Sequence, residues 1–308
     1  MRDVFISKLS ELISEFPEII LITGDLGFGV LDKFKESFPN NFINAGVAEQ
    51  NMTGIATGMA LEGKIVFTYS IANFSTLRCL EQIRNDACYH EVNVNIVSIG
   101  GGFSYGPLGI SHHSTEDLSI MRSLPEISVI VPSTLWEVQM ATKEIVKHKK
   151  VCYLRIDKSF GEDRKDSSET EFSLGKTRVL AEGDDCTIFV AGGILEEVWE
   201  ARDHLKKIGY NIRVISVHTL KPFDHESVIK AVNETGIIVT IEENTVNGGL
   251  GSLICESILD NGLKPEKFLR IGLNSQFSSI VGSQKYLRKC YGLDSQSIIS
   301  KVSSLIKK

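Results

Sequence analysis

One carboxylate, Glu49, stands near the head of a segment rich in small residues, "GVAEQNMTGIATGMALEGK". Apolar residues recur in it at three- and four-residue spacing: Met52, Ile55, Ala56 and Met59. This spacing predicts a helix over residues 48–61 with one buried stripe, so Glu49 falls in the first turn, where the helix dipole favours an anion. Two interpretations stay open. Glu49 is either a solvated residue of the first turn, or an acid buried at an interface, where desolvation raises its pKa and suits it to proton transfer.

The same helix carries Gly54 and Gly58, four residues apart and therefore on one face. Glycine costs about 1 kcal/mol in a helix interior relative to alanine. We therefore expect this face to pack closely against another element.

A second candidate is the segment "FTYSIANFSTLRCLEQIRND" (residues 67–86), which follows a predicted strand directly. Ile71 and Phe74 lie three residues apart and would form one side of a flat apolar pocket. The alternative is that both residues are plain core, because an aromatic residue at helical spacing is usually part of the core.

A third candidate is the loop "GGGFSYGPLGISHHSTED" (residues 100–117), which also follows a predicted strand. Its paired histidines, His112 and His113, would lie beyond the carboxyl end of that strand, where open α/β sheets place ligands. The pair resembles metal ligands, but no third ligand follows at a recognisable spacing. Neutral imidazoles that hydrogen-bond a substrate fit the pattern better.

Length and composition limit the class of protein. The 308 residues predict about two domains, and 42% hydrophobic with 23% charged residues are typical of a globular chain. The net charge of −6 argues against nucleic acid as the main partner. The six cysteines are scattered, which indicates a reducing compartment, and no uncharged stretch is long enough to span a membrane. We expect a cytoplasmic protein.

Short apolar runs alternate with helix-like segments, which predicts an α/β fold of two domains, each a mostly parallel sheet flanked by helices. The runs in the first half are residues 19–23, 65–69, 94–99, 127–132 and 151–156. The runs in the second half are residues 186–193, 212–220, 237–244 and 268–273. A polar, charged stretch separates the halves. We predict a first domain over residues 1–160, a linker over 161–172 and a smaller domain over 173–308.

Taken in order, these motifs resemble the C-terminal half of a transketolase. The segments that carry the resemblance are "GDLG", "NAGVAEQNMTGIATGMALEGK", "FTYSIANFSTLRCLEQIR", "GISHHSTEDLSIMRSLP", "YLR" and "TLKPFD…EENTVNGGLGS". The resemblance implies a pyrimidine-binding domain for thiamine diphosphate followed by a transketolase C-terminal domain. It also implies a role in carbohydrate metabolism, in which a two-carbon ketol unit passes from a ketose donor to an aldose acceptor.

The resemblance assigns roles to the first candidates. Glu49 matches the family's invariant glutamate, which hydrogen-bonds a ring nitrogen of the cofactor's aminopyrimidine and shares a proton there. Phe74 and Ile71 match the pyrimidine pocket, although the family commonly has an aromatic residue where this chain has Ile71. His112 matches a histidine that contacts substrate oxygens and helps proton transfer, and His113 takes the place of a glutamine.

The resemblance also points to Asp25, which matches an acid close to the cofactor, and to Arg155. Arg155 matches an arginine that holds the phosphate in relatives acting on sugar phosphates, a task that suits a guanidinium fork. The alternative for Arg155 is a surface ion pair. Leu108 stands where the family has an acid that binds donor hydroxyls, so the specificity of this chain for its sugars is expected to differ.

The family's motif for the cofactor's diphosphate and its Mg²⁺ is not matched by this sequence. The resemblance therefore implies that the Mg²⁺ (or Ca²⁺) is ligated mainly by a separate subunit of the transketolase N-terminal type. No metal ligand is assigned to this chain. We expect two copies of it in an α2β2 heterotetramer.

Two other functions remain open. The beta subunit of a 2-oxoacid dehydrogenase shares this architecture, although the "GISHHSTEDLSIMR" stretch favours transketolase. The other is a non-catalytic homologue that serves as a binding module, against which the presence of both Glu49 and His112 speaks.

Overall fold

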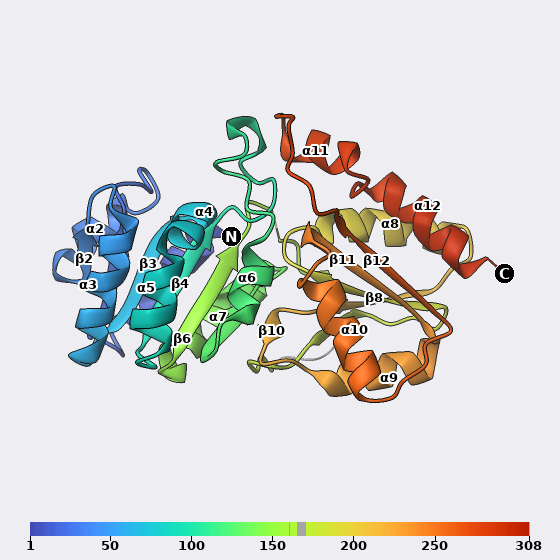
Figure 1. The fold of residues 1–308 in the computed structure, drawn as a ribbon, viewed down its shortest axis with the longest axis horizontal. Coiled ribbons are helices and arrows are strands. Elements are labelled where there is room, and N and C mark those ends of the chain that lie inside the picture. The colour runs from blue at the N-terminus through green and yellow to red at the C-terminus, as the bar shows by residue number, and fades with distance from the viewer. Residues whose placement is uncertain (160, 165–170, 308) are drawn as a thin grey trace.

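The computed structural model describes residues 1–159, 161–164 and 171–307, which form two sheets with helices on both faces of each (Figure 1). The first sheet has the strand order β10 (Thr219–Lys221), β5 (Ile127–Ile130), β6 (Val151–Ile156), β4 (Val94–Ile99), β3 (Ile65–Ile71), β1 (Ile19–Thr23) and β2 (Phe42–Asn44). The second has the order β12 (Lys267–Leu273), β11 (Ile237–Thr245), β8 (Cys186–Ala191), β9 (Ile212–Ser216) and β7 (Arg178–Ala181). All neighbouring strands are parallel except for β10 and β7. The predicted fold class is confirmed.

Helices cover both faces of the two sheets. On one face of the first sheet lie α1 (Arg2–Leu12), α2 (Asp32–Ser37) and α7 (Leu135–His148). On the other lie α3 (Glu49–Leu61), α4 (Ala72–Ser75), α5 (Leu80–Gln82), a π-helical segment (Ile83–Cys88) and α6 (Asp117–Ser123). Beside the second sheet lie α8 (Leu195–Lys207) and α12 (Ser295–Ile306), α9 (His225–Thr235) and α10 (Leu250–Asp260), and α11 (Gln284–Cys290). No helix of the described residues is both long and apolar enough to cross a membrane.

Burial explains why the apolar runs became central strands. In β1 all five residues are buried, and they alternate between two cores. Ile20 and Ile22 belong to the core beneath α3, whereas Ile19 and Leu21 belong to the core beneath α1 and α7. A parallel strand that is covered on both faces needs apolar residues on both, which is why these runs show no polar alternation.

The predicted strand over residues 212–220 is wrong in one respect, because the structure divides it into two strands. The chain leaves the second sheet after Ser216, and β10 then pairs antiparallel with β5 of the first sheet. His218 lies buried at the crossing, where its carbonyl oxygen accepts from the Val131 N–H at 2.9 Å. The run is apolar on both sides of the crossing, so its pattern did not reveal the change of sheet.

The two sheets share one core, which includes Ile96 of β4 and Ile238 of β11. Residues 165–170 of the predicted linker lie outside the described residues, and the predicted domain limits stay predictions. The described residues before and after this gap contact residues of the two predicted domains. Arg178 donates two hydrogen bonds to Asp163, and the Phe172 ring stacks on His218 at 4.2 Å.

Candidate functional site

The candidate residues gather at one edge of the first sheet because β1, β2, β3 and β4 are parallel. In the strand register Thr23 pairs with Asn44, and Ile71 pairs with Ile99, so these strands end at the same edge. The residues that follow these ends come to one side of the sheet, where open α/β sheets bind ligands. The loop after β4 rises from this edge beside α11 (Figure 1).

Glu49 is the first residue of α3, and it is buried in this chain alone, with 2% of its side chain exposed. Its Oε2 accepts a hydrogen bond from Nη1 of Arg78 at 2.7 Å. Its Cγ lies 3.4 Å from the point where a side chain on Gly24 would begin. The interpretation of Glu49 as a solvated residue of the first turn is therefore wrong, and its place at an interface stays a prediction.

Phe74 and His112 are brought together from separate segments. Their ring centroids lie 5.1 Å apart in an edge-to-face arrangement. The Oγ of Ser111 lies 2.9 Å from Nδ1 of His112, and the Tyr105 ring lies 6.2 Å away. Burial lowers the pKa of His112 below its usual value, and the neighbouring His113 lowers it further, so a neutral imidazole is favoured near pH 7. Ile71, the last residue of β3, is partly buried three residues before Phe74.

His113 lies apart from this pair and inside its own loop. The ring is buried, its Nε2–H donates to the carbonyl oxygen of Gly106 at 3.0 Å, and its edge packs on Phe103. The Asn73 amide donates to the carbonyl oxygen of His113 at 2.6 Å. In this structure His113 holds the loop in shape, and these contacts differ from the predicted substrate contact.

Arg155 is enclosed on β6, with 2% of its side chain exposed. Its guanidinium contacts Asp117 at 3.3 Å and Asp157 at 3.5 Å, and it donates to the Glu243 carbonyl oxygen at 3.0 Å. Burial opposes the charge of Arg155, but the neighbouring acids outweigh it and raise the pKa of the guanidinium. The alternative of a surface ion pair is therefore wrong, because Arg155 and both acids are buried, and the phosphate contact stays a prediction.

The enclosure of Arg155 also explains one glycine of the loop after β4. A Cβ on Gly101 would lie 1.6 Å from Nε of Arg155, so no other residue fits there. The glycine run thus makes room for a buried arginine, and this role requires no bound phosphate.

Asp25 lies exposed just beyond β1, with a φ of 57°. Asn44 at the end of β2 donates to its carboxylate at 2.9 Å and accepts from its backbone N–H at 3.0 Å. No hydrogen bond joins Asp25 to Glu49 within the part of the chain that the structure describes. Asp25 is therefore placed at the rim of the site, close in sequence to Gly24, which Glu49 contacts.

Comparison with known proteins identifies the family of this chain. Residues 1–162 match the family model "Transketolase, pyrimidine binding domain" and residues 175–298 match "Transketolase, C-terminal domain". A "Putative transketolase C-terminal section" of Methanocaldococcus jannaschii is 36% identical over 100% of this chain and 96% of its own length. The chain belongs to the transketolase family.

Two further transketolase relatives have similar length. One is a subunit of an apulose-4-phosphate transketolase from Phocaeicola vulgatus, which is 33% identical over 100% of this chain and 97% of its own. A solved structure named "Split gene transketolase, inactive beta4 tetramer" is 33% identical, covers 99% of this chain and 97% of its own, and superposes with a TM-score of 0.88.

The residues at the sheet edge fit one part of the transketolase cofactor. A buried carboxylate beside a partly exposed aromatic ring suits a flat, nitrogen-containing ring such as an aminopyrimidine. Among the described residues, no group of three or more His, Cys, Asp or Glu side chains is arranged to hold a metal ion. The carboxylate and the aromatic ring at this edge thus suit the pyrimidine. Leu108, at the position of the family's acid, is exposed in the loop after β4.

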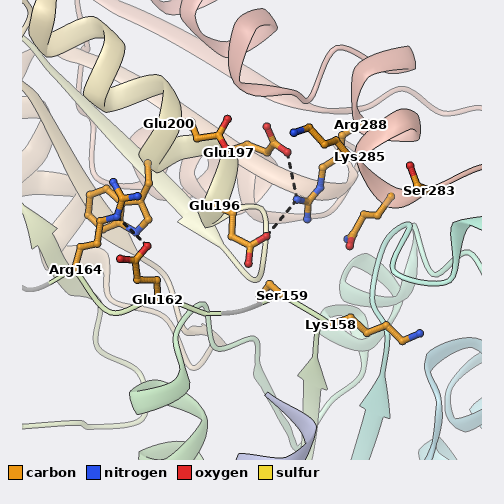
Figure 2. Close-up of a pocket in the computed structure, with 12 residues that line it drawn as sticks. Lys158, Ser159, Glu162, Arg164, Glu196, Glu197, Glu200, Ser283, Lys285 and Arg288 are labelled. Atoms are coloured by element: carbon orange, nitrogen blue, oxygen red, sulfur yellow. Dashed lines mark hydrogen bonds and ion pairs between the residues drawn. The ribbon is translucent and has the colours of Figure 1, made fainter.

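A pocket of about 550 Å³ lies elsewhere, between the segment that follows β6 and the helices α8 and α11 (Figure 2). Its charged groups contact one another. Arg288 lies 3.5 Å from Glu197, and Arg164 lies 3.1 Å from Glu162 (Figure 2). None of the predicted site residues of this transketolase chain lines it.

Sequence reasoning missed Arg78, which contacts both Glu49 and Phe74. A signal was available, because Arg78 follows Phe74 by four residues, the distance of about one helical turn. It was overlooked because its carboxylate partner comes from a different element, 29 residues earlier.

Proposed function

We propose that this chain is the pyrimidine-binding subunit of a thiamine-diphosphate-dependent transketolase. Together with a separate diphosphate-binding subunit, it transfers a two-carbon ketol unit from a ketose donor to an aldose acceptor. The observation that supports this most is Glu49, a buried carboxylate at the ligand-binding edge of the sheet with Phe74 and His112 nearby.

Each residue has a role that its chemistry permits. Thiamine diphosphate, when bound, would supply a carbanion that adds to the carbonyl carbon of the donor, and a positively charged ring that takes up the electron pair of the carbon–carbon bond that breaks. Glu49 would share a proton with a ring nitrogen of the aminopyrimidine, and Phe74 would offer its ring to that heterocycle. His112, whose pKa is lowered by partial burial, would hydrogen-bond substrate oxygens and move a proton between them.

The metal and the diphosphate are assigned to the partner subunit. The uncovered face of α3 supports a partner here, because no described residue has an atom within 4 Å of the points where side chains on Gly54 and Gly58 would begin. The exposed Val47 and Leu61 lie at the two ends of this face. The sequence predicts close packing at these glycines. The described residues of this chain do not supply it, so we propose that the other subunit packs there. The relative described as an inactive beta4 tetramer supports a need for that subunit.

The proposal is tested by reconstitution. The chain is purified with the products of neighbouring genes, supplied with thiamine diphosphate and Mg²⁺, and mixed with ketose donors and aldose acceptors. Apulose 4-phosphate is one donor to include, because a relative is named for it. We expect mass spectrometry to detect ketol transfer by the complex and none by either subunit alone. Transfer by this chain alone would contradict the split site.

The same complex distinguishes the alternative functions. A 2-oxoacid dehydrogenase subunit requires decarboxylation of pyruvate or a related 2-oxoacid, whereas the proposed transketolase does not. A binding module would show neither reaction. Decarboxylation without ketol transfer would replace the proposal with the dehydrogenase interpretation.

A further inference from the structure

Arg78 contacts both Glu49 and Phe74, the two residues that are proposed to bind the pyrimidine ring. Its Nη1 donates to Oε2 of Glu49 at 2.7 Å, and its guanidinium carbon lies 4.5 Å from the centroid of the Phe74 ring. A planar guanidinium can make both contacts at once, since its edge donates hydrogen bonds while its face stacks on an aromatic ring. Lysine, a point charge on a flexible chain, lacks this geometry.

The local backbone holds Arg78 where both contacts form. Arg78 lies on a single 3₁₀ turn, Leu77–Cys79, which follows α4. The next residue, Cys79, is fully buried, and its Sγ contacts the Phe74 carbonyl oxygen at 3.1 Å. The turn is thus anchored through Cys79, whereas the Arg78 side chain remains 45% exposed.

The two oxygens of Glu49 have different surroundings. Arg78 occupies Oε2, whereas no hydrogen bond reaches Oε1 from any residue within 1–159, 161–164 or 171–307. Oε1 lies near Gly24, 3.6 Å from the point where a side chain on that glycine would begin. One acceptor of a buried carboxylate is therefore fixed, and the other is left for a ligand.

Resting on the proposed function, we propose that Arg78 is a positioning residue for Glu49. By holding Oε2 and covering one face of Phe74, Arg78 directs Oε1 toward the ring nitrogen of the bound aminopyrimidine. It also compensates the charge of a carboxylate that is shielded from water, which would otherwise be costly. Arg78 itself takes no part in proton transfer.

The test uses the assembled complex with three variants. Arg78→Met removes the charge and the donors but keeps an apolar stem, and Arg78→Lys keeps the charge without the planar fork. Arg84→Met is the matched control, because Arg84 is an exposed arginine of the same segment and its side chain, among the described residues, bonds only its neighbour Asn85. Three quantities are measured: the dissociation constant of thiamine diphosphate, the rate at which the reactive carbon of the bound cofactor exchanges its proton for deuterium, and the melting temperature of the chain alone.

We expect Arg78→Met to slow the exchange about 100-fold, the effect of misplacing a reacting group by about 1 Å. Its dissociation constant should stay within about threefold of the wild type, because the diphosphate remains bound by the partner. Arg78→Lys should recover part of the rate, and Arg84→Met should match the wild type. A merely structural arginine would instead lower the melting temperature without this separation of binding from exchange.

The proposal is overturned if Arg78→Met exchanges at the wild-type rate, or if Arg84→Met is slowed as much. If Arg78→Met does not assemble with the partner subunit, the exchange rate of Arg78→Lys tests the proposal instead. Exchange at the wild-type rate in Arg78→Lys would then count against the proposal. Failure of the proposed function itself gives a different result. In that case Glu49→Gln also leaves the exchange unchanged, whatever the behaviour of Arg78.

Discussion

Two buried glutamates of this chain, Glu49 and Glu243, differ in how many of their hydrogen-bonding positions the chain itself fills. Glu243, near the end of β11, accepts from the Phe103 backbone N–H at 2.7 Å, from the Gln284 amide at 3.1 Å and from Nε of Arg288 at 2.7 Å. Both of its oxygens are used. Glu49 has one arginine on one oxygen, and that arginine is itself partly exposed.

This difference distinguishes a carboxylate that holds the fold together from one that is free to bind a ligand. A buried carboxylate with all positions filled holds segments together, and Glu243 joins the loop after β4 to α11 in this way. A buried carboxylate with an open acceptor gains its remaining partner only when a ligand binds. Burial of a carboxylate alone is therefore a poor indicator of function. A buried carboxylate oxygen that lacks a hydrogen-bond donor is a better indicator.

The largest expected effect comes from Glu49→Gln in the reconstituted transketolase. The amide keeps the size of the side chain and an oxygen for Arg78, but it cannot share a proton with the ring nitrogen. We expect ketol transfer to fall about 10³- to 10⁴-fold, toward the upper end of what general acid–base catalysis contributes. The stability of the chain should change by less than about 1 kcal/mol, because the lost ion pair is partly exposed. Steady-state kinetics and urea unfolding measure the two quantities.

Glu62→Gln is the control for this experiment. Glu62 is an exposed glutamate at the other end of α3, so it loses the same charge without touching the site. Transfer at the wild-type rate by Glu49→Gln would refute the catalytic assignment, and the binding-module interpretation would gain.

The sequence predicted those features that depend on local pattern. The apolar run of β1 and the periodicity of α3 were sufficient for both elements, since burial on one or two faces imposes that pattern directly. The short edge strand β2 and the crossing strand β10 were not predicted as strands of the first sheet. Each has only three residues, and its pairing depends on which strand the fold brings alongside.

The same limit applies to the site. Glu49 and Phe74 were found because each lies in a recognisable segment, and the structure places Arg78 between them. The enclosure of Arg155 was not foreseen, because Asp117 and Glu243 reach it from elements 38 and 88 residues away. Residue type and spacing thus identified the groups able to do chemistry. Residue type and spacing did not reveal which of those groups form hydrogen bonds or ion pairs with other residues of the chain.

A smaller effect is expected from Glu243→Gln, and it falls on stability. The substitution leaves the guanidinium of Arg288, which is 4% exposed, without its main carboxylate partner. Breaking a buried ion pair costs about 3–5 kcal/mol, and we expect the lower end because Arg288 keeps Glu197 at 3.5 Å. Urea unfolding of the chain alone measures this loss. If Glu243→Gln were as stable as the wild type while abolishing transfer, Glu243 would belong with Glu49 and the comparison would fail.

The smallest expected effect comes from two glycines, one on the same helix as Glu49 and one in contact with Glu243. Gly54 is on the exposed face of α3, and a Cβ there would touch none of the described residues, so Gly54→Ala should stabilise the chain alone by up to about 1 kcal/mol through helix propensity. Gly102 has a φ of 57°, and a Cβ there would lie 2.6 Å from Cγ of Glu243, so Gly102→Ala should destabilise the chain by about 1–3 kcal/mol. Thermal unfolding of both variants measures the opposite signs. If both variants changed the melting temperature equally, a side chain at Gly102 would be accommodated as easily as one on the exposed face of α3. That result would contradict the view that the surroundings of Glu243 are closely packed and those of Gly54 are not.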